Sequence, residues 1–141
     1  ACVPSAALQF HGEEAAEACS AGAQATGRVF WRAARIPAGD GVGFDLLKFA
    51  HTFQAAQAIL LDAHVEGYGG GGKTFDWSLI PRGFGRQLVL SGGLDADNVV
   101  DPVRRIRPWA VDVSSGVESD KGIKDTAKIA AFIAGVRDAD G

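Results

Sequence analysis

The sequence predicts an α/β fold in which roughly five short parallel strands alternate with helices. Two observations support this prediction. Short, continuously apolar segments recur along the 141 residues, and each ends at a polar or glycine-containing turn. The stretches between them show helical periodicity. Strands that are apolar along their whole length are typical of a parallel sheet that is covered on at least one face.

The predicted strands follow one another at similar intervals. In chain order the apolar segments are Leu8–Phe10, 29–34, 59–61, 88–90 and 110–113. The turns that follow them begin at His11, Ile36, Asp62, Ser91 and Ser114.

The predicted helices lie between and after these strands. The last one is the clearest, because four apolar residues at i, i+3, i+4 and i+7 share one face: Ile129, Phe132, Ile133 and Val136. Another helix is predicted from 95 to 107, with Asp95 as its cap and Pro102 in its interior. An interior proline removes a backbone hydrogen bond and costs on the order of 3 kcal/mol, so we expect a kink or a break at Pro102.

The spacing of the strands leaves two architectures open. A (β/α)8 barrel uses ~25–31 residues for each strand–helix unit, and the strand ends here are separated by about that much. The chain would then hold roughly five units of such a barrel. An open, doubly wound sheet of five strands has the same periodicity. In either case, 141 residues with 47% hydrophobic composition suit a single domain, 1–141.

The composition argues against several functional classes. A net charge of −3, with acids and bases mixed, provides neither a basic surface for nucleic acid nor a polybasic membrane patch. No apolar segment approaches the ~18 residues of a membrane span, and the N-terminus does not resemble a signal peptide. Cys2 and Cys19 show no metal-ligand spacing, so we expect a cytoplasmic protein without a metal. Because the chain contains no methionine, we expect either that residues were removed or that it is a piece of a longer protein.

The segment 67–74, G-Y-G-G-G-G-K-T, matches the P-loop pattern GxxxxGK[ST]. A P-loop needs a strand that runs directly into the glycines and a helix of several turns after them. Here the strand ends at Asp62, four further residues separate it from Gly67, and Pro81 stops any helix after about two turns. Because this context does not fit, a P-loop nucleotide-binding domain is only the alternative interpretation. In it, Lys73 would bind phosphate and Asp112 would help to hold Mg²⁺.

Two turns rich in glycine and serine, 91–94 and 114–117, follow the last two predicted strands. Glycine lets backbone N–H groups approach an anion closely, and a helix N-terminus adds a favourable dipole. Either turn alone is explained by a tight strand-to-helix connection, which also favours Gly and Ser. The pair matches the phosphate site after strands 7 and 8 of many barrels. We therefore predict phosphate binding by Gly92, Gly93, Ser114 and Ser115.

Three ionisable residues at strand ends are candidates for chemistry. Asp62 ends an apolar strand, where partial desolvation tends to raise the pKa of a carboxyl group and suits a general acid. The commoner role of such an aspartate is to cap a turn. Asp112 would either face a substrate or need a buried partner. His11 could donate to a substrate, although a lone histidine in a turn is more often structural.

Four segments together make the sequence resemble the phosphoribosylanthranilate isomerase family, barrel enzymes of tryptophan biosynthesis. They are L-Q-F-H-G-E at 8–13, L-L-D at 60–62 with G-G-G-G-K-T-F-D-W at 69–77, L-S-G-G-L at 90–94, and A-V-D-V-S-S-G-V-E at 110–118. The resemblance assigns the glycine run to the loop after strand 6 of that family. It implies a (β/α)8 TIM barrel, present here as an N-terminally truncated partial barrel of about five parallel strands, roughly units four to eight.

The resemblance also implies an Amadori rearrangement of N-(5-phosphoribosyl)anthranilate, an aldose-to-ketose isomerisation that uses no metal or cofactor. The family's general acid corresponds to Asp62, which would protonate the furanose ring oxygen. Substrate contacts correspond to Asp112 and His11, and phosphate contacts to the two turns. The partner is therefore a small phosphorylated sugar–anthranilate, with no nucleic acid or membrane involved.

The sequence departs from the family in ways that affect activity. The family's general base is a cysteine in a Lys-x-Cys-Gly context, which this chain lacks, and its carboxylate-binding arginine would lie upstream of Ala1. Gly71 stands where the family often has Ser or Thr. We therefore expect the chain alone to be inactive and to self-associate through unpaired strand edges. A non-catalytic, phosphate-binding half-barrel is the second alternative.

Overall fold

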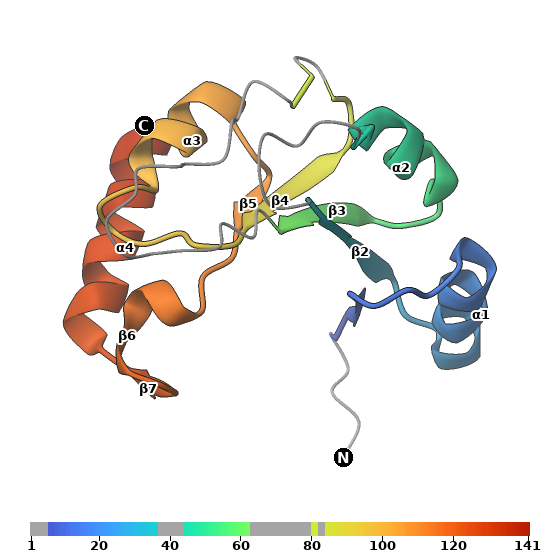
Figure 1. Ribbon diagram of the computed structural model, residues 1–141, viewed down its shortest axis with the longest axis horizontal. Coiled ribbons are helices and arrows are strands. Elements are labelled where there is room, and N and C mark those ends of the chain that lie inside the picture. Colours follow the sequence, from blue (N-terminus) through green and yellow to red (C-terminus); the bar gives the residue numbers. More distant parts are fainter. Residues whose placement is uncertain (1–5, 37–43, 63–79, 82–83) are drawn as a thin grey trace.

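A computed structural model describes residues 6–36, 44–62, 80–81 and 84–141. In this part of the chain, one sheet contains the strands β1 Leu8–Phe10, β2 Phe30–Arg35, β3 Ala58–Asp62, β4 Gln87–Ser91 and β5 Ala110–Val111 (Figure 1). All neighbouring strands are parallel, which confirms the predicted sheet. Their order in the sheet is their order in the chain. A sequential order is typical of barrels, whereas a doubly wound sheet reverses its strand order at a switch point.

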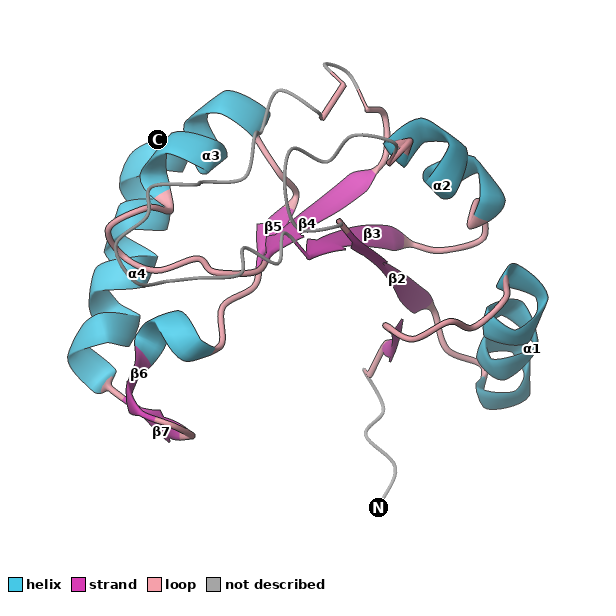
Figure 2. Cartoon of the chain, in the orientation of Figure 1, coloured by secondary structure: helices cyan, strands magenta, loops and turns pink. Residues whose placement is uncertain are grey.

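The helices follow the strands along the chain, and Figure 2 shows them around the periphery of the view with the strands at the centre. Their bounds are α1 Ala16–Thr26, α2 Leu46–Thr52, α3 Val100–Ile106 and α4 Thr126–Asp140. The helix α1 connects β1 to β2, α2 connects β2 to β3, and α3 connects β4 to β5. In these three connections, the alternation of strand and helix is the one that the apolar segments predicted.

The two faces of the sheet differ in what covers them. Successive side chains of a strand point to opposite faces. One face contributes Phe30, Ala34, Ile59, Leu61, Leu88 and Leu90 to a core that also contains apolar residues of all four helices. The other face carries a smaller apolar cluster without any residue from a described helix: Trp31, Ala33, Ala58, Leu60, Val89 and Ala110. Helices on one face only are typical of a barrel, in which the opposite face is the interior.

The helix α3 begins at Val100, so the prediction of one helix from 95 to 107 with a kink or a break at Pro102 is wrong. Pro102 is the third residue of the helix. The N–H groups of the first turn have no acceptor within the helix, so the N–H that proline lacks costs no hydrogen bond there. The Asp95 carboxylate caps a separate turn before the helix, accepting from the N–H groups of Asp97 and Asn98 at 2.9 and 3.0 Å. The sequence pattern had merged a turn and a short helix into one element.

The segment after β5 contains an antiparallel hairpin that the sequence analysis missed. A short 3-10 helix, η2 Ser115–Val117, leads into β6 Glu118–Asp120 and β7 Ile123–Lys124. The helix α4 follows and buries Phe132 as its periodicity predicted, whereas Ile133 is 44% exposed. The hairpin therefore stands between the last strand of the sheet and the last helix.

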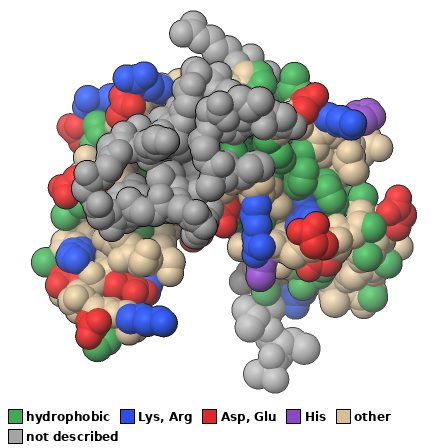
Figure 3. Space-filling view, viewed as in Figure 1, with side chains coloured by type: hydrophobic (Ala, Val, Ile, Leu, Met, Phe, Trp, Pro, Cys, Tyr) green, Lys and Arg blue, Asp and Glu red, His purple; other side chains and the backbone are tan. Residues whose placement is uncertain are grey.

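The described surface mixes acidic and basic side chains, as the face shown in Figure 3 illustrates. No helix among the described residues is both long and apolar enough to cross a membrane.

Candidate active site

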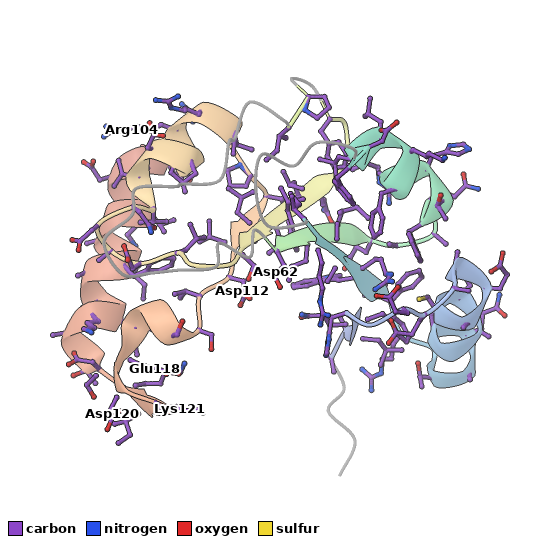
Figure 4. All side chains as sticks on the ribbon, viewed as in Figure 1. Asp62, Arg104, Asp112, Glu118, Asp120 and Lys121 are labelled. Carbon is purple, nitrogen blue, oxygen red and sulfur yellow. The ribbon has the colours of Figure 1, made fainter. Side chains whose placement is uncertain are left out.

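The C-terminal ends of the parallel strands align four polar residues, which we call the strand-end row: Arg35, Asp62, Ser91 and Asp112. Arg35 is in register with Asp62, and Asp62 with Ser91. The Ser91 hydroxyl donates to Asp112 Oδ2 at 2.8 Å. Figure 4 shows Asp62 and Asp112 at this end of the sheet. The row therefore joins two carboxylates predicted from sequence to an arginine and a serine hydroxyl.

The direction of the row follows from the alternation of each strand. Side chains at positions i and i+2 share a face. Each member of the row lies two residues after a member of the helix-free apolar cluster, namely Ala33, Leu60, Val89 and Ala110. Asp62 is partly buried at this position, whereas Asp112 is exposed. The row therefore lies on the helix-free face, where Asp112 is exposed to solvent and accepts a hydrogen bond from the Ser91 hydroxyl.

His11 follows β1 and is exposed, with Nδ1 3.5 Å from Arg35 Nη2. Arg35 therefore lies between His11 and the carboxylates of the row. Sequence reasoning missed Arg35, although it ends its apolar segment as Asp62 ends the next one. His51 lies in the last turn of α2 and has no part in the row, while His64 is outside the described residues.

The turn that carries His11 is held by Arg32, which is 5% exposed. The guanidinium donates to the carbonyl oxygens of Phe10 at 3.1 Å, Gly12 at 2.9 Å and Glu14 at 3.3 Å. It also lies 4.6 Å from the centre of the Phe53 ring. Hydrogen bonds from the backbone N–H groups of Glu14 and Gly12, with the charge of Arg32, lower the pKa of the Glu14 carboxyl group. Arg32 thus fixes the β1–α1 turn from the helix-facing side.

The two turns predicted to bind phosphate are in direct contact. Gly92 and Gly93 have φ values of 84° and 63°, a left-handed conformation that favours glycine. A Cβ atom on Gly116 would lie 1.9 Å from the Leu94 carbonyl oxygen, so only glycine permits this approach. The structure therefore brings both turns together, with Gly92 directly after Ser91 and Ser114 two residues after Asp112.

The second turn is supported by Lys124 of the β6–β7 hairpin. Lys124 Nζ donates to the Ser114 carbonyl oxygen at 2.9 Å and to Glu118 Oε1 at 2.7 Å. The hydrogen bond from Lys124 and the one from the Gly122 N–H lower the pKa of the Glu118 carboxyl group. Because this support depends on a hairpin that was not predicted, the sequence analysis could not find it.

Cys19 lies in α1 and is completely buried in the helix-facing core. Burial raises the pKa of its thiol, which therefore stays protonated at neutral pH. Cys2 and the glycine-rich segment 67–74 are outside the described residues. No group of three or more His, Cys, Asp or Glu side chains within the described ranges could hold a metal ion.

Comparison with known proteins gives one consistent result. Residues 4–135 match the family model of N-(5'phosphoribosyl)anthranilate (PRA) isomerase. An N-(5'-phosphoribosyl)anthranilate isomerase of Leptothrix cholodnii is 60% identical over 138 residues, which cover 98% of this chain and 59% of the relative. The chain thus spans about three fifths of the length of that relative.

Two solved structures show the same similarity. Phosphoribosyl anthranilate isomerase from Thermotoga maritima is 41% identical with a TM-score of 0.73, over 94% of this chain and 62% of the other. A second isomerase structure, in complex with reduced 1-(o-carboxyphenylamino)-1-deoxyribulose 5-phosphate, is 37% identical with a TM-score of 0.70. This match covers 94% of the present chain and 59% of that structure.

Proposed function

Because this chain belongs to the N-(5'-phosphoribosyl)anthranilate isomerase family, we propose that it carries the acid and the phosphate site of such an isomerase. The reaction is the Amadori rearrangement of N-(5-phosphoribosyl)anthranilate to its 1-deoxyribulose 5-phosphate product in cytoplasmic tryptophan biosynthesis. One observation supports this proposal most strongly. The strand-end row and both glycine–serine turns lie at the same end of the sheet.

Asp62 is the proposed general acid. It would transfer a proton to the furanose ring oxygen, so that the ring C–O bond breaks and an iminium forms at the anomeric carbon. A base then removes the proton from the neighbouring sugar carbon, and the resulting enolamine tautomerises to the ketone. The partly buried position of Asp62 suits an acid that must donate its proton to a bound substrate.

Asp112 and His11 are the proposed substrate contacts. The hydroxyl of Ser91 holds one oxygen of Asp112 and so restricts the rotation of this exposed carboxylate. Arg35 contributes a cation between His11 and Asp62. A ligand that carries a carboxylate, hydroxyls and a phosphate would find matching groups along this edge.

The phosphate is proposed to bind the backbone of the paired turns, at Gly92, Gly93, Ser114 and Ser115. Left-handed glycines leave backbone N–H groups free of side-chain crowding, so that they can approach an anion. The contact between Gly116 and the Leu94 carbonyl oxygen keeps the two turns at a fixed separation.

We further propose that the five strands form an arc of a (β/α)8 barrel. Their sequential order and their helices on one face support this reading. Within the described residues, β1 and β5 each pair on one side only. Such edges present backbone N–H and C=O groups that pair with other strands, so the 141-residue chain is expected to self-associate.

The 141-residue chain by itself is proposed to bind substrate without turning it over. Cys19 is buried, is protonated and lies on the opposite face of the sheet from the row. The Lys-x-Cys-Gly pattern of the family's base does not occur in the sequence.

Calorimetric titration with reduced 1-(o-carboxyphenylamino)-1-deoxyribulose 5-phosphate tests this proposal. We expect the wild type to bind, and Asp112→Asn to weaken binding about tenfold, which corresponds to ~1.4 kcal/mol. His51→Gln, a control outside the row, should leave the affinity unchanged. Absence of binding would contradict the proposal. Magnesium-dependent ATP binding that Lys73→Ala abolishes would favour the P-loop alternative instead.

A further inference from the structure

The β6–β7 hairpin lies against the second of the two turns proposed to bind phosphate. Its two ends meet in the ion pair of Glu118 and Lys124, with 2.7 Å between Oε1 and Nζ. Their side chains are 16% and 45% exposed, so the pair is partly shielded from water. Lys124 Nζ also reaches Ser114, at 2.9 Å from its carbonyl oxygen and 3.5 Å from Oγ. The cation is thus held by a carboxylate on one side and bound to the turn on the other.

Further hydrogen bonds tie the same turn to α4. The Asp125 N–H donates to the Val117 carbonyl oxygen at 2.8 Å, and Lys128 Nζ donates to that of Glu118 at 2.7 Å. Asp125 is also the N-terminal cap of α4, where its side chain accepts two backbone N–H groups. The far end of the turn is therefore anchored on a helix, and Lys124 anchors its near end at Ser114.

The bond to Ser114 determines where the next backbone N–H points. The Ser114 carbonyl and the Ser115 N–H belong to one peptide group, and no cis peptide occurs in the described part of the chain. In a planar trans peptide the C=O and N–H bonds point in opposite directions. Lys124 therefore directs the Ser115 N–H away from the hairpin. No described residue accepts a hydrogen bond from this N–H.

Lys124 also reduces the repulsion between the Ser114 carbonyl oxygen and an anion bound at the turn. A carbonyl oxygen that is free to rotate toward the turn would present its negative end to an anion. An ammonium group bound to that oxygen compensates its partial charge and keeps it on the hairpin side. The Glu118 carboxylate holds the ammonium in place, because its proximity restricts the otherwise flexible lysine side chain.

We propose that Lys124, held by Glu118, is a positioning residue that orients the Ser114–Ser115 peptide group for phosphate binding. This inference rests on the proposed phosphate site. Because the hairpin is largely exposed, the loss of Lys124 should affect the geometry of the turn much more than the stability of the fold.

The test is a titration of the 141-residue chain with inorganic phosphate, monitored through the backbone amide signals of Ser115 and Gly92. Lys124→Met should raise the dissociation constant about fivefold or more and reduce the shift of the Ser115 signal. Lys124→Arg keeps a cation with several donors, so its affinity should stay within about twofold of the wild type. Lys121→Met removes an equal charge from the exposed turn of the same hairpin (Figure 4) and should also stay within about twofold.

The outcomes separate this inference from the proposed function. If the wild type shows no phosphate-dependent shift at Ser115 or Gly92, the phosphate site itself is wrong. If the wild type binds and Lys124→Met binds equally well, the positioning role is wrong and the phosphate site stands. An equal loss with Lys121→Met would mean that net charge, not position, controls binding, and would also overturn the inference.

A second variant covers the case in which Lys124→Met unfolds. Glu118→Gln keeps the lysine but removes the charge that holds it, and thermal melting reports whether the fold is intact. We expect a cooperative melt with phosphate binding weakened about twofold. Unchanged phosphate affinity in a folded Glu118→Gln protein would contradict the proposed role of the ion pair.

Discussion

At each end of the sheet a cationic side chain donates hydrogen bonds to backbone carbonyl oxygens of a loop, but the two side chains differ in how deeply they are buried. At the β1 end, a guanidinium binds three backbone carbonyl oxygens of the turn that carries His11. At the β5 end, an ammonium binds one carbonyl oxygen of the turn that carries Ser115. The Arg32 side chain is 6% exposed, whereas that of Lys124 is 45% exposed.

This difference in depth separates stability from function. Carbonyl groups that lose a buried donor cannot recruit water, so the cost appears in the folding free energy. A carbonyl group at an exposed hairpin can be solvated, so the cost appears in the orientation of the turn. The β1 end should therefore be sensitive in unfolding experiments, and the β5 end in binding experiments.

The largest effect is expected from Arg32→Met, which keeps the aliphatic volume and removes every donor. We expect a loss of about 3 kcal/mol in the free energy of unfolding, measured by urea denaturation. Lys124→Met should cause a much smaller loss in the same experiment. Equal losses for the two variants would show that the depth of the cation does not control its contribution.

The next effect is expected from Gly116→Ala, because the added Cβ atom would lie 1.9 Å from the Leu94 carbonyl oxygen. The clash must separate the two turns, so we expect a loss of about 1–3 kcal/mol together with a loss of phosphate binding. Gly27→Ala at the C-terminus of α1 is the matched control. It has φ of 62° and an open site, so it should cost about 1 kcal/mol and leave phosphate binding unchanged. Intact phosphate binding in Gly116→Ala would place the anion elsewhere.

Ser91→Ala affects the row between the two ends. It removes the hydroxyl that donates to Asp112, so we expect about fivefold weaker binding of the reduced deoxyribulose phosphate ligand in calorimetry. Inorganic phosphate should bind with unchanged affinity, since Gly92, Gly93, Ser114 and Ser115, the residues proposed to bind it, are unchanged. A parallel loss for both ligands would mean that Ser91 supports the turns and not the carboxylate.

The smallest effect is expected from pH. The pKa of Glu118 is lowered from its ordinary value of 4.5, chiefly by the hydrogen bond from Lys124. Because the pKa is lowered, the ionised Glu118 carboxylate stabilises the folded hairpin fully above pH 4.5. This stabilisation is lost as the pH falls through the pKa of the folded state. The amide signal of Gly122, which donates to Glu118, should therefore change below pH 4.5. Glu118→Gln should lack this transition, and a wild-type midpoint above pH 4.5 would contradict the assigned cause.

The elements that could be predicted are those encoded locally. Apolar segments such as 59–61 and 88–90 marked buried strands, and the spacing of Ile129, Phe132 and Val136 marked α4. Pro102 was interpreted wrongly because capped turns and first helical turns share the same residue types.

The parts of the site that could not be predicted depend on register and on contacts between distant elements. Asp62 and Asp112 were recognised as strand-end carboxylates, but no local pattern places Arg35 beside Asp62. The hydrogen bond from Lys124 to the Ser114 carbonyl oxygen forms only because the chain turns back through a hairpin. Such positioning residues have ordinary neighbours in sequence, so only the fold reveals them.

The most direct test is a titration with reduced 1-(o-carboxyphenylamino)-1-deoxyribulose 5-phosphate, monitored by the backbone amide signals of the 141-residue chain. If the row and the turns form one site, the signals of Asp62, Asp112, Gly92 and Ser115 should shift together with a single dissociation constant. If only Gly92 and Ser115 shift, as expected for inorganic phosphate, the chain binds phosphate without recognising the rest of the substrate, and the assigned roles of both carboxylates are wrong.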